Sequence, residues 1–142
     1  MPRGRAKALM QAHIRTVMHG RLVTATPTDS GVVIAARIAA HGIGAVPVVD
    51  ADHRLLGIVS TSDLVYRLHD GKRLDDVSAA DLMTRDPISI DEFAPAEEAI
   101  GVMRNALIRH LPVTREGRLV GMVTAADLIR HLVQDATGPE VA

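Results

Sequence analysis

The chain has 142 residues, 47% of them hydrophobic, with 16 Lys and Arg against 17 Asp and Glu and a formal net charge of −1. This balance predicts no overall field that would draw in nucleic acid or an anionic membrane surface, so neither partner is expected. The sequence contains no cysteine, which excludes disulfides, thiolate metal sites and cysteine nucleophiles and favours a reducing compartment, the cytoplasm. No stretch approaches the roughly 18 to 20 consecutive apolar residues that a membrane-spanning helix requires.

The first element expected is a basic helical extension over residues 1–13. Its charges resemble the start of a signal peptide, but His13 and Arg15 interrupt the apolar stretch that such a peptide needs, so no export signal is predicted. The basic residues are interpreted as the solvated face of a terminal helix. Contact with nucleic acid is the less favoured alternative, because one Phe, one Tyr and no Trp offer little aromatic surface for stacking.

A short strand, a helix and a hairpin are predicted next. Val23-Thr24 has strand character, and the polar residues at 28–30 are typical of a helix start. Gly42 is expected to end this helix. Two β-rich runs, 45–49 and 55–60, are joined by a polar turn and predict a β-hairpin. The apolar face of the helix is predicted to comprise Val32, Val33, Ala36, Ala39 and Ala40.

The second half of the chain shows the same order of elements. Residues 88–90 have strand character, Pro95 suits the first turn of a helix, and the runs 111–114 and 119–123 predict a second hairpin. A further helix is expected to follow each hairpin directly. The apolar face of the first helix in this half is predicted to comprise Ala96, Ala99, Ile100, Met103 and Leu107.

The two halves are copies of one unit. GAVPVVDADHRLLGIVSTSDLVYRL (44–68) aligns with RHLPVTREGRLVGMVTAADLIRHL (109–132). Each copy has the order β-α-β-β-α, which predicts the mixed α/β (α+β) class. At roughly 55 residues neither copy is expected to be stable alone, so the two are expected to pack together. The expected organisation is an N-terminal extension (1–13), a first repeat (14–68), a linker (69–78), a second repeat (79–134) and a flexible tail (135–142).

The motifs V-P-V-V-D…L-L-G-I-V-S-T-S-D-L and L-P-V…L-V-G-M-V-T-A-A-D-L resemble the signature of paired cystathionine-β-synthase (CBS) domains, often called a Bateman module. The resemblance spans about residues 14 to 132. It implies pseudo-twofold symmetry, homodimer formation, and two clefts that in many members bind AMP, ATP, related adenosine compounds or S-adenosylmethionine. An allosteric regulatory module that is not an enzyme is therefore expected. The alternative is a scaffold that uses the pair only for dimerisation or for docking an unidentified effector protein.

Two serine or threonine residues and two aspartates are the leading candidates for ligand binding. Ser60 and Thr124 stand where a strand turns into a helix, so their hydroxyls and the amides that follow are placed to meet a phosphate. Asp63 and Asp127, three positions later, are placed to accept hydrogen bonds from both hydroxyls of a ribose. The alternative is that these pairs only cap their helices; capping and ligand binding are compatible.

Four further residues are assigned to the candidate site. Arg109 and His110 resemble family positions that contact phosphates, whereas the first copy has glycine and alanine there, so two unequal sites are expected. Ordinary exposed residues are the alternative interpretation for this pair. Pro47 and Pro112 are expected to shape the strands beside the purine, with an edge-strand proline that has no ligand role as the alternative.

Catalytic and metal sites are not predicted. Ser60 lies outside any Gly-x-Ser-x-Gly turn, and the sequence has no Gly-x-x-x-x-Gly-Lys phosphate-binding loop. The seven histidines show no dense ligand spacing, so no metal and no cofactor are expected. The candidate ligands are AMP, ADP, ATP, NAD and S-adenosylmethionine, and the sequence does not distinguish among them.

Overall fold

A computed structural model describes residues 3–136, which divide into two compact units. Unit 1 takes in the chain up to Leu22, residues Ile88–Glu116 and the chain from Val120 onward, and unit 2 comprises Val23–Pro87 with Gly117–Leu119. Both contain helices and strands, so the predicted α+β class is confirmed. Residues 137–142, most of the predicted tail 135–142, lie outside the described residues.

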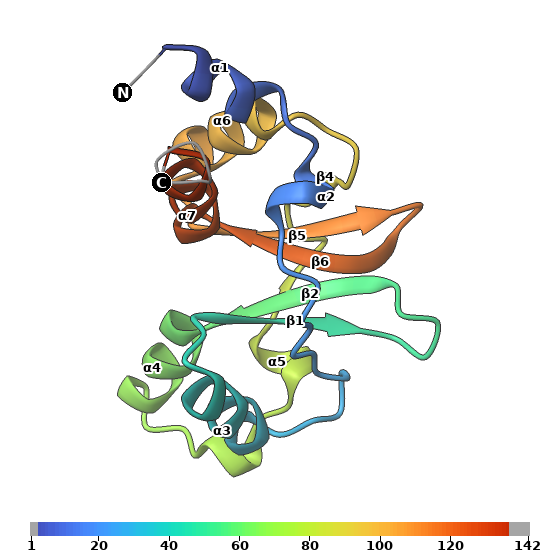
Figure 1. Cartoon of the computed structure of the whole chain (residues 1–142). Helices are drawn as coiled ribbons and strands as arrows, with labels where there is room; N and C mark the ends of the chain where they lie inside the picture. Colours follow the sequence, from blue (N-terminus) through green and yellow to red (C-terminus); the bar gives the residue numbers. More distant parts are fainter. Residues whose placement is uncertain (1–2, 137–142) are drawn as a thin grey trace. The chain divides into compact units, whose positions relative to one another are not determined.

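Unit 2 is a small antiparallel sheet with helices on one side (Figure 1). The sheet has the order β1-β2-β3, and Ala25 adds a single parallel bridge to Val48 of β1. The predicted hairpin is confirmed with its bounds unchanged. The elements of this unit are α3 (Gly31–His41), β1 (Ala45–Val49), β2 (Leu55–Ser60), α4 (Thr61–His69), the 3-10 helix η1 (Leu74–Asp76), α5 (Ala79–Leu82) and β3 (Thr84–Arg85).

Helix α3 begins and ends where the sequence predicts, but its buried face is the opposite one. Ser30 caps the helix by accepting a hydrogen bond from the Val33 amide, and Gly42 ends it at a φ of 61°. The predicted face is wrong, because Val32 is 48% exposed and Ile34 is fully buried. The helix is apolar almost all round, so periodicity alone does not select a face. The unit 2 core comprises Ala25, Ile34, Val46, Val48, Val59, Leu64, Val77, Ala79 and Leu82.

Unit 1 repeats this architecture and adds an N-terminal helix. The sheet has the order β4-β5-β6, in which β4 runs parallel to β5, and His19 pairs antiparallel with Met122 of β6. Helix α1 packs against α6 and α7, as Figure 1 shows. The elements are α1 (Arg3–Gln11), α2 (Ile14–Val17), β4 (Ile90–Asp91), α6 (Ala96–Ala106), β5 (His110–Arg115), β6 (Arg118–Thr124) and α7 (Ala125–Ala136).

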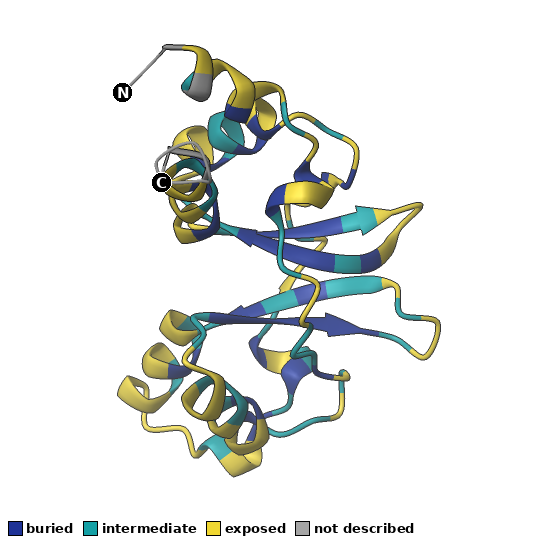
Figure 2. Cartoon of the chain, viewed as in Figure 1, coloured by how far each residue is buried: buried dark blue, intermediate teal, exposed yellow. Residues whose placement is uncertain are grey.

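Several local predictions in the two copies are displaced by one or two residues. Pro95 is the N-cap of α6 and not a first-turn residue. Leu107, assigned to the buried face, is 90% exposed, because it ends the helix in the left-handed conformation at a φ of 56°. The strand expected at Val23-Thr24 is a bridge at Ala25. The unit 1 core comprises Leu9, Ile14, Val17, Ile90, Ala96, Ala99, Met103, Leu111, Val113, Val123 and Leu128; Figure 2 shows the strands mainly buried and the outer helical faces exposed.

Each sheet is completed by a segment that belongs to the other copy of the sequence repeat. Residues 14–22 open the first repeat but pack in unit 1, where His19 pairs with β6. Residues 79–87 open the second repeat but pack in unit 2, where β3 pairs with β2. The compact units are therefore not the contiguous repeats of the sequence.

One glycine in each unit allows a methionine to lie against the sheet. A Cβ atom at Gly57 would stand 2.5 Å from Met83 Sδ and 2.8 Å from the Thr84 carbonyl oxygen. At the equivalent Gly121, a Cβ atom would stand 2.5 Å from Met18 Sδ. Gly57 therefore requires the absence of a side chain, because a Cβ atom there would overlap a backbone oxygen. At Gly121 the nearest backbone atom, the His19 carbonyl oxygen, is 3.1 Å away, so a Cβ atom would mainly displace the Met18 side chain.

Replacing Gly57 with alanine is expected to lower the free energy of unfolding by about 1 to 3 kcal/mol, because the new methyl group overlaps a backbone oxygen that cannot move freely. Urea titration followed by circular dichroism measures the change, since the chain has no Trp. Gly101→Ala is the matched control: nothing lies within 4 Å of its Cβ position in α6, and stability should stay constant or rise by up to about 1 kcal/mol. A Gly57→Ala protein as stable as the wild type would contradict the packing described.

Candidate functional site

The turn from β2 into α4 carries a reciprocal pair of hydrogen bonds between Ser60 and Asp63. The Asp63 amide donates to Ser60 Oγ at 3.4 Å, and the Ser60 amide donates to Asp63 Oδ2 at 2.8 Å. Ser60 Oγ also donates to Asp63 Oδ2 at 3.0 Å. These bonds satisfy helix-start donors that would otherwise lack partners, so the capping interpretation of both residues is correct.

The same contacts determine which groups remain for a ligand. The Thr61 amide donates to the Gly44 carbonyl at 3.0 Å, and the Asp63 amide is used by the cap, so neither can meet an anion. Asp63 is half-buried, and its Oδ1 accepts no hydrogen bond within the described part of the chain. The turn therefore offers one open carboxylate oxygen and the Ser62 amide, fewer donors than the sequence suggested.

The turn from β6 into α7 has the same backbone arrangement in unit 1. The Thr124 amide donates to Asp127 Oδ2 at 2.9 Å, and the Asp127 amide donates to Thr124 Oγ1 at 3.0 Å. The Ala125 amide donates to the Arg109 carbonyl at 3.1 Å, as Thr61 does to Gly44 in unit 2. The duplication is thus preserved in the hydrogen bonds as well as in the sequence.

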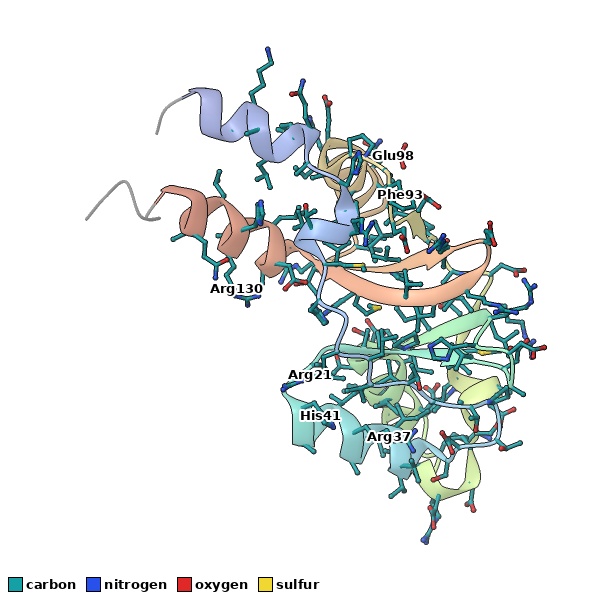
Figure 3. The ribbon with its side chains drawn as sticks, turned by 45° about the vertical axis from the view of Figure 1, so that its right-hand side comes forward. Arg21, Arg37, His41, Phe93, Glu98 and Arg130 are labelled. Atoms are coloured by element: carbon teal, nitrogen blue, oxygen red, sulfur yellow. The ribbon has the colours of Figure 1, made fainter. Side chains whose placement is uncertain are left out.

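Asp127 differs from Asp63 in its side-chain partners. His19 Nδ1 lies 2.8 Å from Asp127 Oδ2, and Arg130 Nη1 donates to Asp127 Oδ1 at 2.8 Å; Figure 3 labels Arg130 on α7. The Asp127 side chain is only 6% exposed. His19 was not predictable as a partner, because it lies 108 residues away and the repeat aligns it with a threonine, Thr84. Arg130 lies three residues after Asp127, and this helical i,i+3 spacing is a signal that the sequence analysis did not use.

Electrostatics keep the charged Asp127 stable in this setting. Burial raises the pKa of Asp127, but hydrogen bonds from the Thr124 amide and from His19 outweigh it, and the net pKa lies below the ordinary value. Burial lowers the pKa of His110, and the positive charge of Arg109 lowers it further against the opposing effect of Asp127. His110 is therefore mostly neutral near pH 7 and offers a ligand a hydrogen bond without a positive charge.

The remaining predicted residues fall into the two units. Arg109 is exposed and His110 half-buried at the start of β5, in the unit that also holds Thr124 and Asp127. Pro47 and Pro112 are fully buried within β1 and β5. The Pro47 carbonyl accepts a hydrogen bond from the Ala25 amide at 3.0 Å. The nitrogen of Pro47 faces the same edge of β1, where the only neighbour among the described residues is the single bridge at Ala25, so the missing amide hydrogen breaks no hydrogen bond of the hairpin. This favours a structural role for the proline rings.

The fold and the paired turns agree with the family comparison. The model of the CBS domain matches residues 14–70 and 79–134, which together make up most of the chain. The chain therefore belongs to the CBS domain family, and it carries two of these domains in tandem.

Two relatives illustrate the similarity. The uncharacterized protein MK0525 of Methanopyrus kandleri is 35% identical over 111 residues, which cover 77% of this chain and 57% of that protein. The uncharacterized protein YlbB of Bacillus subtilis is 35% identical over 116 residues, which cover 81% of this chain and 78% of YlbB. The chain thus spans little more than half of the first relative and most of the second.

Solved structures share the fold. The crystal structure of hypoxic response protein I with two coordinated zinc ions, a protein found in Mycobacterium tuberculosis, aligns with a TM-score of 0.78 at 30% identity, over 84% of this chain and 98% of that one. The CBS domain pair of protein MJ0100, in complex with 5′-methylthioadenosine and S-adenosyl-L-methionine, aligns with a TM-score of 0.76 at 27% identity, over 84% and 98% of the two chains.

The zinc ions belong to the neighbouring structure of hypoxic response protein I. The sequence has no cysteine, and within residues 3–136 no group of three His, Asp or Glu side chains could hold a metal ion. Structural zinc sites take four such ligands, and catalytic ones at least three.

Within residues 3–136, no helix has the length and apolar character needed to cross a membrane.

Asp127→Asn is expected to lower the free energy of unfolding by about 1 to 3 kcal/mol at pH 7, because the buried carboxylate loses charge-assisted hydrogen bonds. The folded-state pKa of Asp127 lies below its ordinary value of 3.8, so this stabilisation is present above that value and is lost as the pH falls through the folded-state pKa. Urea titrations should show that the difference in unfolding free energy between wild type and variant is smaller at about pH 2.5 than at about pH 5. The exposed Asp52→Asn serves as control. A difference of equal size at both pH values would contradict the stabilising role of the Asp127 carboxylate.

Proposed function

We propose that this protein is a regulatory module that binds an adenosine-containing small molecule and does not catalyse a reaction. The observation that carries the proposal is the turn from β2 into α4, where Asp63 is oriented by its cap and keeps Oδ1 open. The ligands of the MJ0100 pair, 5′-methylthioadenosine and S-adenosyl-L-methionine, support an adenosine compound. Both carry a ribose and an adenine, which are also the shared parts of AMP, ADP, ATP and NAD.

The chemistry of the turn suits the sugar better than the phosphate. A carboxylate has about four lone-pair sites and accepts both hydroxyls of a ribose, and such charge-assisted bonds contribute roughly 1.5 to 3 kcal/mol each. Phosphate contacts would have to come from the Ser62 amide in unit 2 and from Arg109 in unit 1, since the cap uses the Ser60 hydroxyl. These groups therefore favour a ligand that is recognised mainly through its nucleoside.

Regulation requires that the ligand prefer one conformation of the protein over another. A ligand with equal affinity for two arrangements shifts neither, however tightly it binds. We expect the ligand to prefer one arrangement of the two repeats, or of two chains, over another. The protein that receives the signal is an effector of a class that the site does not specify.

Thermal unfolding with AMP, ADP, ATP, NAD and S-adenosylmethionine is expected to show stabilisation by at least one compound. A ligand at about 100 times its Kd adds roughly 2.7 kcal/mol, which raises the Tm by several degrees for a protein of this size. Asp63→Ala should abolish the shift.

The matched control for this variant is Asp81→Ala. Asp81 forms the same reciprocal cap with Ser78 at the start of α5, with hydrogen bonds of 3.0 and 3.3 Å, but it is not a candidate ligand group. Both variants lose a helix cap, and only Asp63→Ala should lose the ligand. If no compound stabilises the wild type, the proposal of adenosine sensing fails and the docking scaffold becomes the better explanation.

We further propose that the chain forms a homodimer through the outer helical face of unit 2. Val65, Tyr66 and Leu68 of α4 are 57%, 66% and 54% exposed, and Val32 of the neighbouring α3 is 48% exposed. Large apolar side chains exposed on two packed helices suit burial against a partner, and a second copy offers an identical face for a twofold interface.

Val65→Glu is expected to shift the protein from dimer to monomer in sedimentation equilibrium, because the dimer would have to bury an unpaired charge. Ile88→Glu is the control, since Ile88 is 50% exposed outside this face and its replacement should leave the dimer intact. A wild type that is monomeric at high micromolar concentration would refute the dimer.

A further inference from the structure

The two candidate ribose-binding carboxylates differ in availability. Asp63 bonds only within its own cap, and Oδ1 has no partner among the described residues. Asp127 receives His19 on Oδ2 and Arg130 on Oδ1, each at 2.8 Å, in addition to its cap. The two amide bonds of each cap are shared. Oδ2 of each aspartate also accepts a second hydrogen bond, which comes from the rotatable Ser60 hydroxyl in unit 2 and from the His19 ring in unit 1.

His19 is the firmer of the two partners. Its amide donates to the Met122 carbonyl at 3.0 Å and its carbonyl accepts from the Met122 amide at 3.1 Å, so the backbone of His19 is held at the edge of β6. The side chain of the adjacent Met18 lies against Gly121 of the same strand. Arg130 is 62% exposed, and its i,i+3 pair with Asp127 is of the surface kind that contributes little and gives way readily.

The other copy provides an internal comparison at the same positions. Thr84, which pairs with Ile58 of β2, corresponds to His19, which pairs with Met122 of β6. Tyr66, 66% exposed, corresponds to Arg130. Neither Thr84 nor Tyr66 has a hydrogen bond to Asp63 among the described contacts, so the corresponding carboxylate of unit 2 is left open.

We propose, resting on the function proposed above, that the His19 imidazole occupies the edge of Asp127 that a ribose would use, so that the chain binds one adenosine ligand, at Asp63. A ribose that engages both oxygens of Asp127 must displace His19, whose backbone is held at β6, and Arg130, whose side chain is mostly exposed. His19 is thus a specificity-determining residue that closes one of two duplicated half-sites. A second ligand binds only when the strand segment that carries His19 moves away.

The test is the number of ligands bound per chain, measured by isothermal titration calorimetry with AMP and with S-adenosylmethionine on the full chain. The wild type should bind one molecule, and His19→Thr, which installs the residue found at the equivalent position of unit 2, should bind two. Adding Asp127→Ala to His19→Thr should return the number to one. The reciprocal Thr84→His should weaken binding at Asp63 by at least tenfold. Circular dichroism and the Tm show whether each variant is folded.

The outcomes separate this inference from the proposed function. One ligand in both wild type and His19→Thr overturns the role of His19 and leaves adenosine sensing intact. Two ligands in the wild type, reduced to one by Asp127→Ala, also overturn it. No ligand in the wild type but one in His19→Thr supports the closure by His19 while the proposal for Asp63 fails. No ligand in either protein overturns both.

A measurement without ligand tests the contact itself. The Nδ1 proton of His19 should give a slowly exchanging resonance in nitrogen-edited NMR spectra of the wild type, because it is held between the ring and Asp127 Oδ2. Asp127→Asn should change or remove that resonance, whereas Asp52→Asn should not. A His19 ring that exchanges freely in the wild type would overturn the closure whatever the calorimetry gives.

Discussion

The reciprocal hydrogen bonds at the two strand-to-helix turns are the contacts on which both halves of the molecule depend. Ser60 and Thr124 each accept the amide of an aspartate three residues later, and the aspartate carboxylate accepts the amide of the cap. These bonds start α4 and α7, and they also fix the direction of the two carboxylates. Helix formation and the geometry of the candidate site therefore share one set of contacts, so the candidate ligand groups are oriented by the same bonds that start the helices.

Duplication gives the chain two copies of this arrangement, and a few side chains make the copies unequal. The backbone of both turns is tied back to the start of a neighbouring strand, through Gly44 in one unit and Arg109 in the other. The buried Asp127 needs partners to keep its charge, and the Thr124 amide and His19 supply them. Asp63 is less buried and has hydrogen bonds only to its own cap among the described residues. A carboxylate that is well satisfied by the protein is a weaker acceptor for a ligand.

The fold was predictable from the sequence wherever a local signal was strong. The hairpin 45–49 and 55–60 has Gly57 and a polar turn, and its bounds agree with β1 and β2. The buried face of α3 was not predictable, because Val32 and Ile34 lie on different faces of a helix that is apolar on nearly every side. Leu107 fits the apolar pattern of α6, but it lies just after the last helical residue, where the helical period no longer predicts which way a side chain points.

The sequence by itself determined the duplication, the order of the elements, the family and the two capping aspartates, because these depend on residues close together in the chain or on a repeated pattern. Only the tertiary structure decided that residues 14–22 and 79–87 each complete the sheet of the other copy. It also brought His19 to Asp127 across 108 residues. Neither the periodicity nor the composition of the sequence predicts this contact, because it depends on where the edge of β6 places one side chain once the sheet has formed.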